Sequence, residues 1–170
     1  MNTQRSRVIL AALITGMSLS MPTQGVGREQ LKSDTKFLWP AAGRLVDGFC
    51  HRSDDTGTNG INLAVAPGTD IHAVESGEIA YAGNELRGYH NLIIIRHADG
   101  WMSAYAQNDE MLVKRRDIVT RGQVIAKIRD PGYPPFHFEL HQRTKPVNPL
   151  LYLENTDHHM AQLNGARCRG

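Results

Sequence analysis

The sequence predicts an all-β domain over residues 37–153, in which an antiparallel sheet carries a polar groove. Three observations indicate this fold class. Short apolar or alternating runs follow one another along the domain. Glycine, proline and asparagine separate these runs. No apolar pattern of helical period continues for three turns. The chain of 170 residues is long enough for one such domain and too short for two.

The predicted strands form eight runs along the domain. They cover residues 44–46, 60–64, 71–73, 78–82, 92–97, 101–107, 123–128 and 137–142. Residues 92–95 are apolar on both faces, so we expect this strand near the centre of the sheet. The tight connection at Asp99-Gly100 predicts a hairpin between this strand and the next.

Alternation of side chains gives two of these strands distinct faces. In the last strand, the apolar face carries Phe136, Phe138 and Leu140, and the polar face carries His137, Glu139 and His141. In the second strand of the hairpin, one face carries Trp101, Ser103, Tyr105 and Gln107. The pattern predicts a core on one side of the sheet and a polar groove floor on the other.

The segments outside the domain have different roles. Residues 1–27 are interpreted as a secretory signal peptide, because Arg5 and Arg7 precede a mostly apolar run at residues 8–19. That run is shorter than the ~20 residues of a spanning helix. We therefore expect no membrane span after signal removal, with a retained anchor as the alternative, and a periplasmic or secreted location. Residues 28–36 are interpreted as a linker and residues 154–170 as a flexible tail.

Charge and cysteine content set further limits. The formal net charge is +2, and the signal contains two arginines and no acidic residue, so the mature chain is close to neutral. Nucleic-acid binding requires clustered positive charge, and the run Lys114-Arg115-Arg116 is interpreted as a solvated turn. In an oxidising compartment Cys50 and Cys168 could form a disulfide, or they could remain two separate thiols.

Several motifs in a fixed order resemble one known family. They include Gly60-Ile61-Asn62-Leu63-Ala64, Tyr105-Ala106-Gln107, Arg121-Gly122-Gln123, His137-Phe138-Glu139 and Val147-Asn148-Pro149. Over residues 37–153 the chain resembles the lysostaphin-type, or LytM, zinc metallopeptidase domain. The resemblance implies a LytM-like antiparallel β fold and an activity on peptide cross-bridges of peptidoglycan.

The resemblance also implies a zinc site, which this sequence does not reproduce. The implied ligands are a histidine, an aspartate four residues later and the second of two paired histidines, and these positions carry Thr58, Asn62 and His137. Two further implied histidines are replaced by Gln107 and Pro135. Only His137 matches, and neutral oxygen donors do not replace an imidazole and a carboxylate at zinc. We expect no catalytic residue and no cofactor, with zinc as the cofactor of the alternative interpretation.

The same positions are candidates for binding a partner. The candidate groove residues are Thr58, Asn62, Tyr105, Gln107, His137 and Glu139. Tyr105 could stack on a glycan or a partner, or pack within the sheet. Glu139 could act as a general base or as a hydrogen-bond partner under the groove.

Within the family the chain is most similar to the degenerate amidase activators of the NlpD and EnvC type. The main hypothesis is therefore a secreted, catalytically inactive LytM-like domain that regulates or scaffolds peptidoglycan hydrolysis. Its expected partners are peptidoglycan, a cell-wall amidase or another hydrolase, and no nucleic acid. The alternatives are a zinc endopeptidase that cleaves peptidoglycan cross-bridges and a passive peptidoglycan-binding module.

Overall fold

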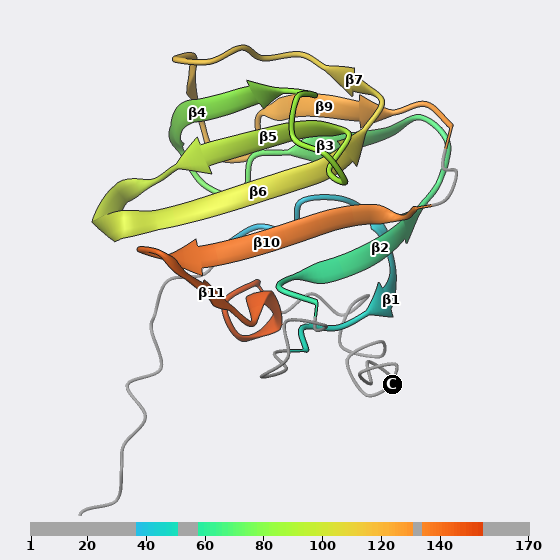
Figure 1. The fold of residues 1–170 in the computed structure, drawn as a ribbon, viewed down its shortest axis with the longest axis horizontal. Helices are drawn as coiled ribbons and strands as arrows, with labels where there is room; N and C mark the ends of the chain where they lie inside the picture. Colours follow the sequence, from blue (N-terminus) through green and yellow to red (C-terminus); the bar gives the residue numbers. More distant parts are fainter. Residues whose placement is uncertain (1–36, 51–57, 131–133, 155–170) are drawn as a thin grey trace, which may run out of the picture. The chain divides into compact units, whose positions relative to one another are not determined.

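The structure, a computed structural model, describes residues 37–50, 58–130 and 134–154, which form a mainly antiparallel β domain (Figure 1). Its strands are β1 (Gly43–Asp47), β2 (Ile61–Val65), β3 (Thr69–His72), β4 (Gly77–Gly83), β5 (Asn91–Arg96), β6 (Trp101–Asn108), β7 (Glu110–Met111), β8 (Ile118–Val119), β9 (Val124–Ile128), β10 (Phe136–Gln142) and β11 (Lys145–Val147). Two 3-10 helices are described, η1 (Ala98–Gly100) and η2 (Pro149–Leu151). Neither of these helices has the length or apolar character that crossing a membrane requires.

The strands form a large sheet and a small sheet. The large sheet has the order β1-β2-β10-β6-β5-β4-β8, and β11 pairs with β10. The small sheet has the order β3-β9-β7. Figure 1 shows β10 and β6 crossing the middle of the large sheet, with β1 and β4 toward opposite sides. This order places the end of β10 between β2 and β6, where the candidate site lies.

The prediction of an all-β antiparallel fold is confirmed, and each of the eight predicted strands overlaps an observed one. β5 and β6 form the predicted hairpin, and Asp99 in the connection has a positive φ of 55°. The short strands β7, β8 and β11 were not predicted. They have only two or three residues each, too few for a period of two to be recognised in the sequence.

The faces of β10 are divided as predicted. Phe136, Phe138 and Leu140 are buried in one core cluster that also includes residues of the small sheet. Tyr105 lies in this core as well and has no exposed surface. Its hydroxyl oxygen accepts hydrogen bonds from the Val74 N–H and the Ser103 hydroxyl, each at 3.0 Å. The prediction of Tyr105 as a groove residue is therefore wrong, because its side chain points to the inner face of the sheet.

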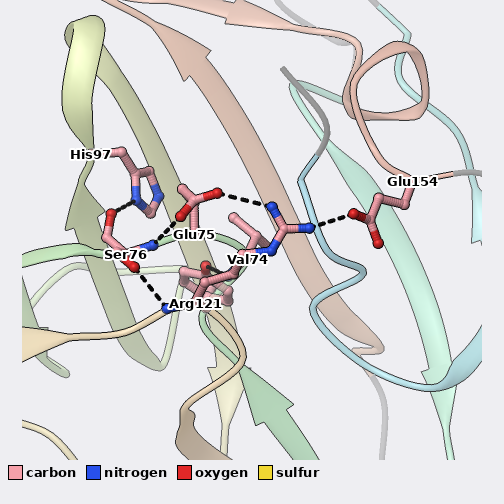
Figure 2. Close-up of polar contacts among 7 residues, drawn as sticks. Val74, Glu75, Ser76, His97, Arg121 and Glu154 are labelled. Atoms are coloured by element: carbon pink, nitrogen blue, oxygen red, sulfur yellow. Dashed lines mark hydrogen bonds and ion pairs between the residues drawn. The ribbon is translucent and has the colours of Figure 1, made fainter. Parts of the chain in front are cut away.

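A polar cluster around Arg121 holds one end of the domain together (Figure 2). Its guanidinium pairs with Glu75 at 3.0 Å and also with Glu154, and its backbone N–H donates to Ser76 Oγ at 2.9 Å. His97 Nδ1 lies 2.9 Å from the Ser76 carbonyl oxygen, and burial lowers the pKa of His97. The arginine of the Arg121-Gly122-Gln123 motif thus has a structural role, since it links two turns to the last described residue.

Four predictions fall wholly or partly outside the described residues. The signal peptide, the linker and the residues after Glu154 are not described. Cys50 is described and forms an isolated β-bridge with Thr58, but Cys168 lies outside the described residues. The Cys50–Cys168 disulfide stays a prediction.

Candidate functional site

A groove of about 640 Å³ opens on the outer face of the large sheet, where β1, β2, β10 and β6 lie side by side. Its floor and walls are formed by Val46, Asp47, Asn62, Gly88, Tyr89, Ala106, Gln107, Pro134, Pro135 and His137. Asp47 is paired directly with Asn62, Asn62 with His137, and His137 with Ala106. Residues in direct register across a sheet lie on the same face, so these side chains meet on the groove floor.

Five residues on the outer face of the sheet, three of which line the groove, form one chain of hydrogen bonds, which we call the polar chain. It runs in the order Asp47, Asn62, His137, Glu139 and His141. Asn62 Nδ2 donates to Asp47 Oδ2 at 3.2 Å, and Asn62 Oδ1 lies 2.7 Å from His137 Nδ1. Glu139 Oε1 lies 3.0 Å from His137 Nε2, and Glu139 Oε2 lies 2.6 Å from His141 Nε2. The chain thus connects three neighbouring strands, β1, β2 and β10.

Glu139 is the most buried charged group of the polar chain, with 7% of the residue exposed. Burial alone would raise the pKa of its carboxyl group. Hydrogen bonds from His137 and His141, together with their charge, outweigh burial and lower the pKa to about 2. Glu139 is therefore a carboxylate at neutral pH, which can accept hydrogen bonds but donate none. Of the two roles considered from the sequence, this geometry is that of a hydrogen-bond partner.

His137 has an acceptor at each ring nitrogen. The Asn62 oxygen faces Nδ1, and its assignment is fixed because the Asn62 amide nitrogen donates to Asp47. The Glu139 carboxylate faces Nε2. Both contacts are complete only when each ring nitrogen carries a proton. A zinc ligand needs the opposite state, a neutral imidazole that offers a lone pair to the metal.

The residues at the implied zinc positions therefore do not fit the metal. Asn62 replaces a carboxylate with a neutral amide, and both nitrogens of His137 are already hydrogen-bonded. Thr58 offers only a hydroxyl and is not among the groove-lining residues. Among the described ranges, no group of three or more His, Cys, Asp or Glu residues is arranged to hold a metal ion.

We predict that a strong chelator leaves the thermal stability of the purified protein unchanged. A ligand that binds only the folded state raises its stability by mass action, so removing a tightly bound metal would lower the melting temperature. Differential scanning calorimetry with and without EDTA measures this directly. A fall in the melting temperature that added zinc restores would contradict this description of the site.

Gln107 fixes one wall of the groove. Its backbone N–H donates to the Tyr89 carbonyl at 3.1 Å, and its side-chain amide donates to the Gly88 carbonyl at 3.0 Å. Gln107 adopts a left-handed backbone with φ of 66°, which is uncommon for a residue other than glycine. It therefore holds the loop of residues 84–90 beside β6, in the position where the resemblance implies a catalytic histidine.

The loop of residues 84–90 also borders a second hollow, which we call the apolar shelf. The apolar shelf has a volume of about 220 Å³ and is lined by Leu86, Tyr89, Leu92, Ile94, Met102, Ser103, Ala104, Glu139 and His141. Tyr89 lines both hollows and separates them. The negative charge of Glu139 and partial burial raise the pKa of Tyr89, which places the tyrosine within the field of the polar chain.

The structure brings together four of the six predicted groove residues. Asn62, Gln107 and His137 line the groove, and Glu139 lies beside it in the polar chain. Asp47 and Tyr89 were missed by sequence reasoning. The pairing of β1 with β2 places Asp47 opposite Asn62, so a correct prediction of this strand register would have identified Asp47. Tyr89 lies in an irregular loop, and no periodic signal marks it.

Comparisons with known proteins agree with this fold. The murein hydrolase activator NlpD of Escherichia coli (strain K12) is 44% identical over 117 residues, which are 68% of this chain and 30% of NlpD. The structure of Helicobacter pylori Csd3 has a TM-score of 0.64 at 24% identity, covering 72% of this chain and 34% of Csd3, and it supports the fold alone. Lysostaphin from Staphylococcus simulans has a TM-score of 0.56 at 25% identity, covering 65% and 49% of the two chains.

The curated relatives are longer proteins, and this chain spans less than half of the length of NlpD. The sequence model described as peptidase family M23 matches residues 56–149, which include Asn62, Gln107 and His137 and make up more than half of the chain. The chain therefore belongs to peptidase family M23.

Proposed function

We propose that this protein regulates peptidoglycan hydrolysis by binding a cell-wall hydrolase in the groove, and that it does not cut peptidoglycan itself. The similarity to NlpD, a murein hydrolase activator, supports this role. The groove supports it too, because a concave surface of about 640 Å³ with few charges suits a peptide segment of a partner. We place this activity in the periplasm or outside the cell, where peptidoglycan lies.

The observation that carries the proposal is the hydrogen bonding of His137. Its ring nitrogens face Asn62 and Glu139, so the one retained ligand position is occupied by internal contacts. The polar chain fills the position of a metal site and keeps the groove floor ordered. A rigid floor of this kind lowers the entropy cost of binding, because fewer side chains have to be fixed when the partner arrives.

The walls of the groove indicate what the partner must present. Tyr89 on one side and Pro134 and Pro135 on the other give apolar walls, and Asp47 is the one acidic side chain among the lining residues that the structure describes. Aromatic residues in such positions often provide a large share of binding energy. We expect an amphipathic segment of a hydrolase, such as an amidase, whose apolar side chains contact Tyr89 and the prolines.

The proposal predicts that the purified protein accelerates a cell-wall amidase and has no hydrolytic activity alone. Release of dye from labelled peptidoglycan measures both. Tyr89→Ala is expected to weaken activation by at least about tenfold, because it removes the wall shared by the groove and the apolar shelf. Leu151→Ala is the matched control, since Leu151 is exposed and lies outside both hollows.

Two outcomes would overturn the proposal. Zinc-dependent dye release by the protein alone that disappears in His137→Ala would establish a peptidase. Sedimentation with peptidoglycan without any effect on a panel of amidases and endopeptidases would establish a passive binding module.

A further inference from the structure

A second surface feature lies at the opposite edge of the large sheet from β1. Residues 112–117 connect β7 to β8, and we call this connection together with Ile118, the first residue of β8, the basic turn. Lys114, Arg115 and Arg116 are all exposed, and none forms a salt bridge with another described residue. Leu112 and Ile118 flank them with 45% and 74% exposure, and Ile118 is the most exposed large apolar residue in the described ranges.

The basic turn is held firmly against β4. The Lys114 N–H donates to Asp117 Oδ2 at 2.9 Å, and the Asp117 N–H donates to the Lys114 carbonyl at 3.1 Å. The Arg116 N–H donates to the Ile79 carbonyl at 2.8 Å, and the Ile79 N–H donates to the Asp117 carbonyl at 2.9 Å. The positive side chains therefore project from a fixed backbone, so little backbone entropy is lost when the turn binds a ligand.

Arg116 has a backbone conformation that glycine adopts at a lower free-energy cost than a residue with a side chain. Its φ of 77° is in the left-handed region, where a side chain costs roughly 1 kcal/mol or more. No salt bridge to another described residue offsets this strain. An arginine at this position is consistent with a contact outside the domain.

The basic turn carries a net positive charge even when the charged residues around it are counted. Asp117 is partly exposed, and its carboxylate accepts from the Lys114 N–H, so it offsets only one of the three positive charges. Glu78 is paired in register with both Ile118 and Arg96, so the exposed Glu78 and Arg96 offset each other beside the turn. Three cations with two exposed aliphatic side chains match the boundary of an anionic bilayer, where phosphate groups lie above acyl chains. A hydrated polyanion would pair with the three cations, but it would leave the aliphatic side chains of Leu112 and Ile118 exposed to water.

We propose that the basic turn docks the domain on an anionic lipid bilayer. Lys114, Arg115 and Arg116 contact the phosphate groups, and Leu112 and Ile118 enter the upper acyl region. The order of the strands supports this arrangement, because β8 and β1 are the two edges of the large sheet and the groove lies near β1. Docking through β8 leaves the groove open to a partner.

Sedimentation with lipid vesicles tests the proposal. The purified protein is expected to bind phosphatidylcholine vesicles that contain phosphatidylglycerol, and to bind pure phosphatidylcholine vesicles far less. K114Q/R115Q/R116Q should lower the partition coefficient roughly 100-fold, since each basic residue near an anionic surface contributes about fivefold. L112S/I118S should lower it several-fold. R44Q/R143Q/K145Q removes three exposed cations elsewhere and should leave binding unchanged.

Arg116→Gly distinguishes weaker vesicle binding caused by a lost charge from weaker binding caused by poorer folding. Because glycine relieves the left-handed strain, this variant should melt at a higher temperature than the wild type and yet bind vesicles about fivefold more weakly. Equal binding to neutral and anionic vesicles, or an equal loss in the control variant, would overturn the proposal. Binding to soluble polyphosphate that matches vesicle binding and is insensitive to L112S/I118S would also overturn it, in favour of a polyanion ligand.

Discussion

Gly60→Ala is expected to destabilise the domain by at least about 3 kcal/mol, a large part of the roughly 5–15 kcal/mol that stabilises a typical domain. A Cβ atom at Gly60 would lie 2.1 Å from the Phe138 carbonyl oxygen and 2.9 Å from Glu139 Cγ. The oxygen belongs to the backbone of β10, which pairs on both sides and cannot move without breaking the sheet. Urea denaturation followed by circular dichroism measures the loss.

Gly68→Ala provides the matched control for this substitution. Gly68 has a positive φ of 80°, but a Cβ atom there meets no heavy atom within 4 Å. Its replacement should cost only about 1 kcal/mol from backbone strain. If the two variants have similar stability, close packing against β10 is not the reason for glycine at position 60.

Glu139→Gln is expected to remove a large part of the acid sensitivity of the domain. The pKa of Glu139 is lowered from 4.5 to about 2 by its contacts with the two histidines, despite burial. A lowered folded-state pKa stabilises the protein above pH 4.5, and this contribution is lost as the pH falls from 4.5 to about 2. The shift corresponds to roughly 3 kcal/mol at most.

Unfolding in urea at several pH values between 7 and 2 tests this linkage. The wild type should lose stability steeply below pH 4.5, whereas Glu139→Gln should start less stable and change less with pH. Glu78→Gln is the control, because Glu78 is an exposed carboxylate on the same face of the sheet. A pH profile of Glu139→Gln parallel to that of the wild type would show that the polar chain does not hold this carboxylate ionised.

The fold could be predicted from sequence to the extent that periodic patterns specify it. The strand at 137–142 is the clearest case, since alternation alone assigned Phe138 to the core and His137 to the groove. The same reasoning could not place Tyr105. It shares a face with Gln107 by alternation, yet Gln107 has a left-handed backbone at the end of β6 and turns out of that pattern. A local change of φ at one residue is not visible in a periodic sequence signal.

The candidate site was only partly predictable because it depends on contacts between distant segments. Asn62 and His137 were identified from the motifs, but their hydrogen bond joins residues 75 positions apart. The role of Gln107 could be predicted only as a missing histidine, whereas the structure gives it a positive role as the support of the loop at residues 84–90. Such roles follow from strand pairing and loop packing, which residue spacing alone does not specify.

The interlocked hydrogen bonds on the groove floor have a consequence for how this protein could change in evolution. Asn62→Asp alone would set two carboxylates against each other, because Asn62 now donates to Asp47. It would also leave His137 Nδ1 facing the side chain at position 62, so this nitrogen would still not be free to bind a metal. A metal site at these positions would therefore require several substitutions together, because Asn62→Asp alone is expected to lower stability.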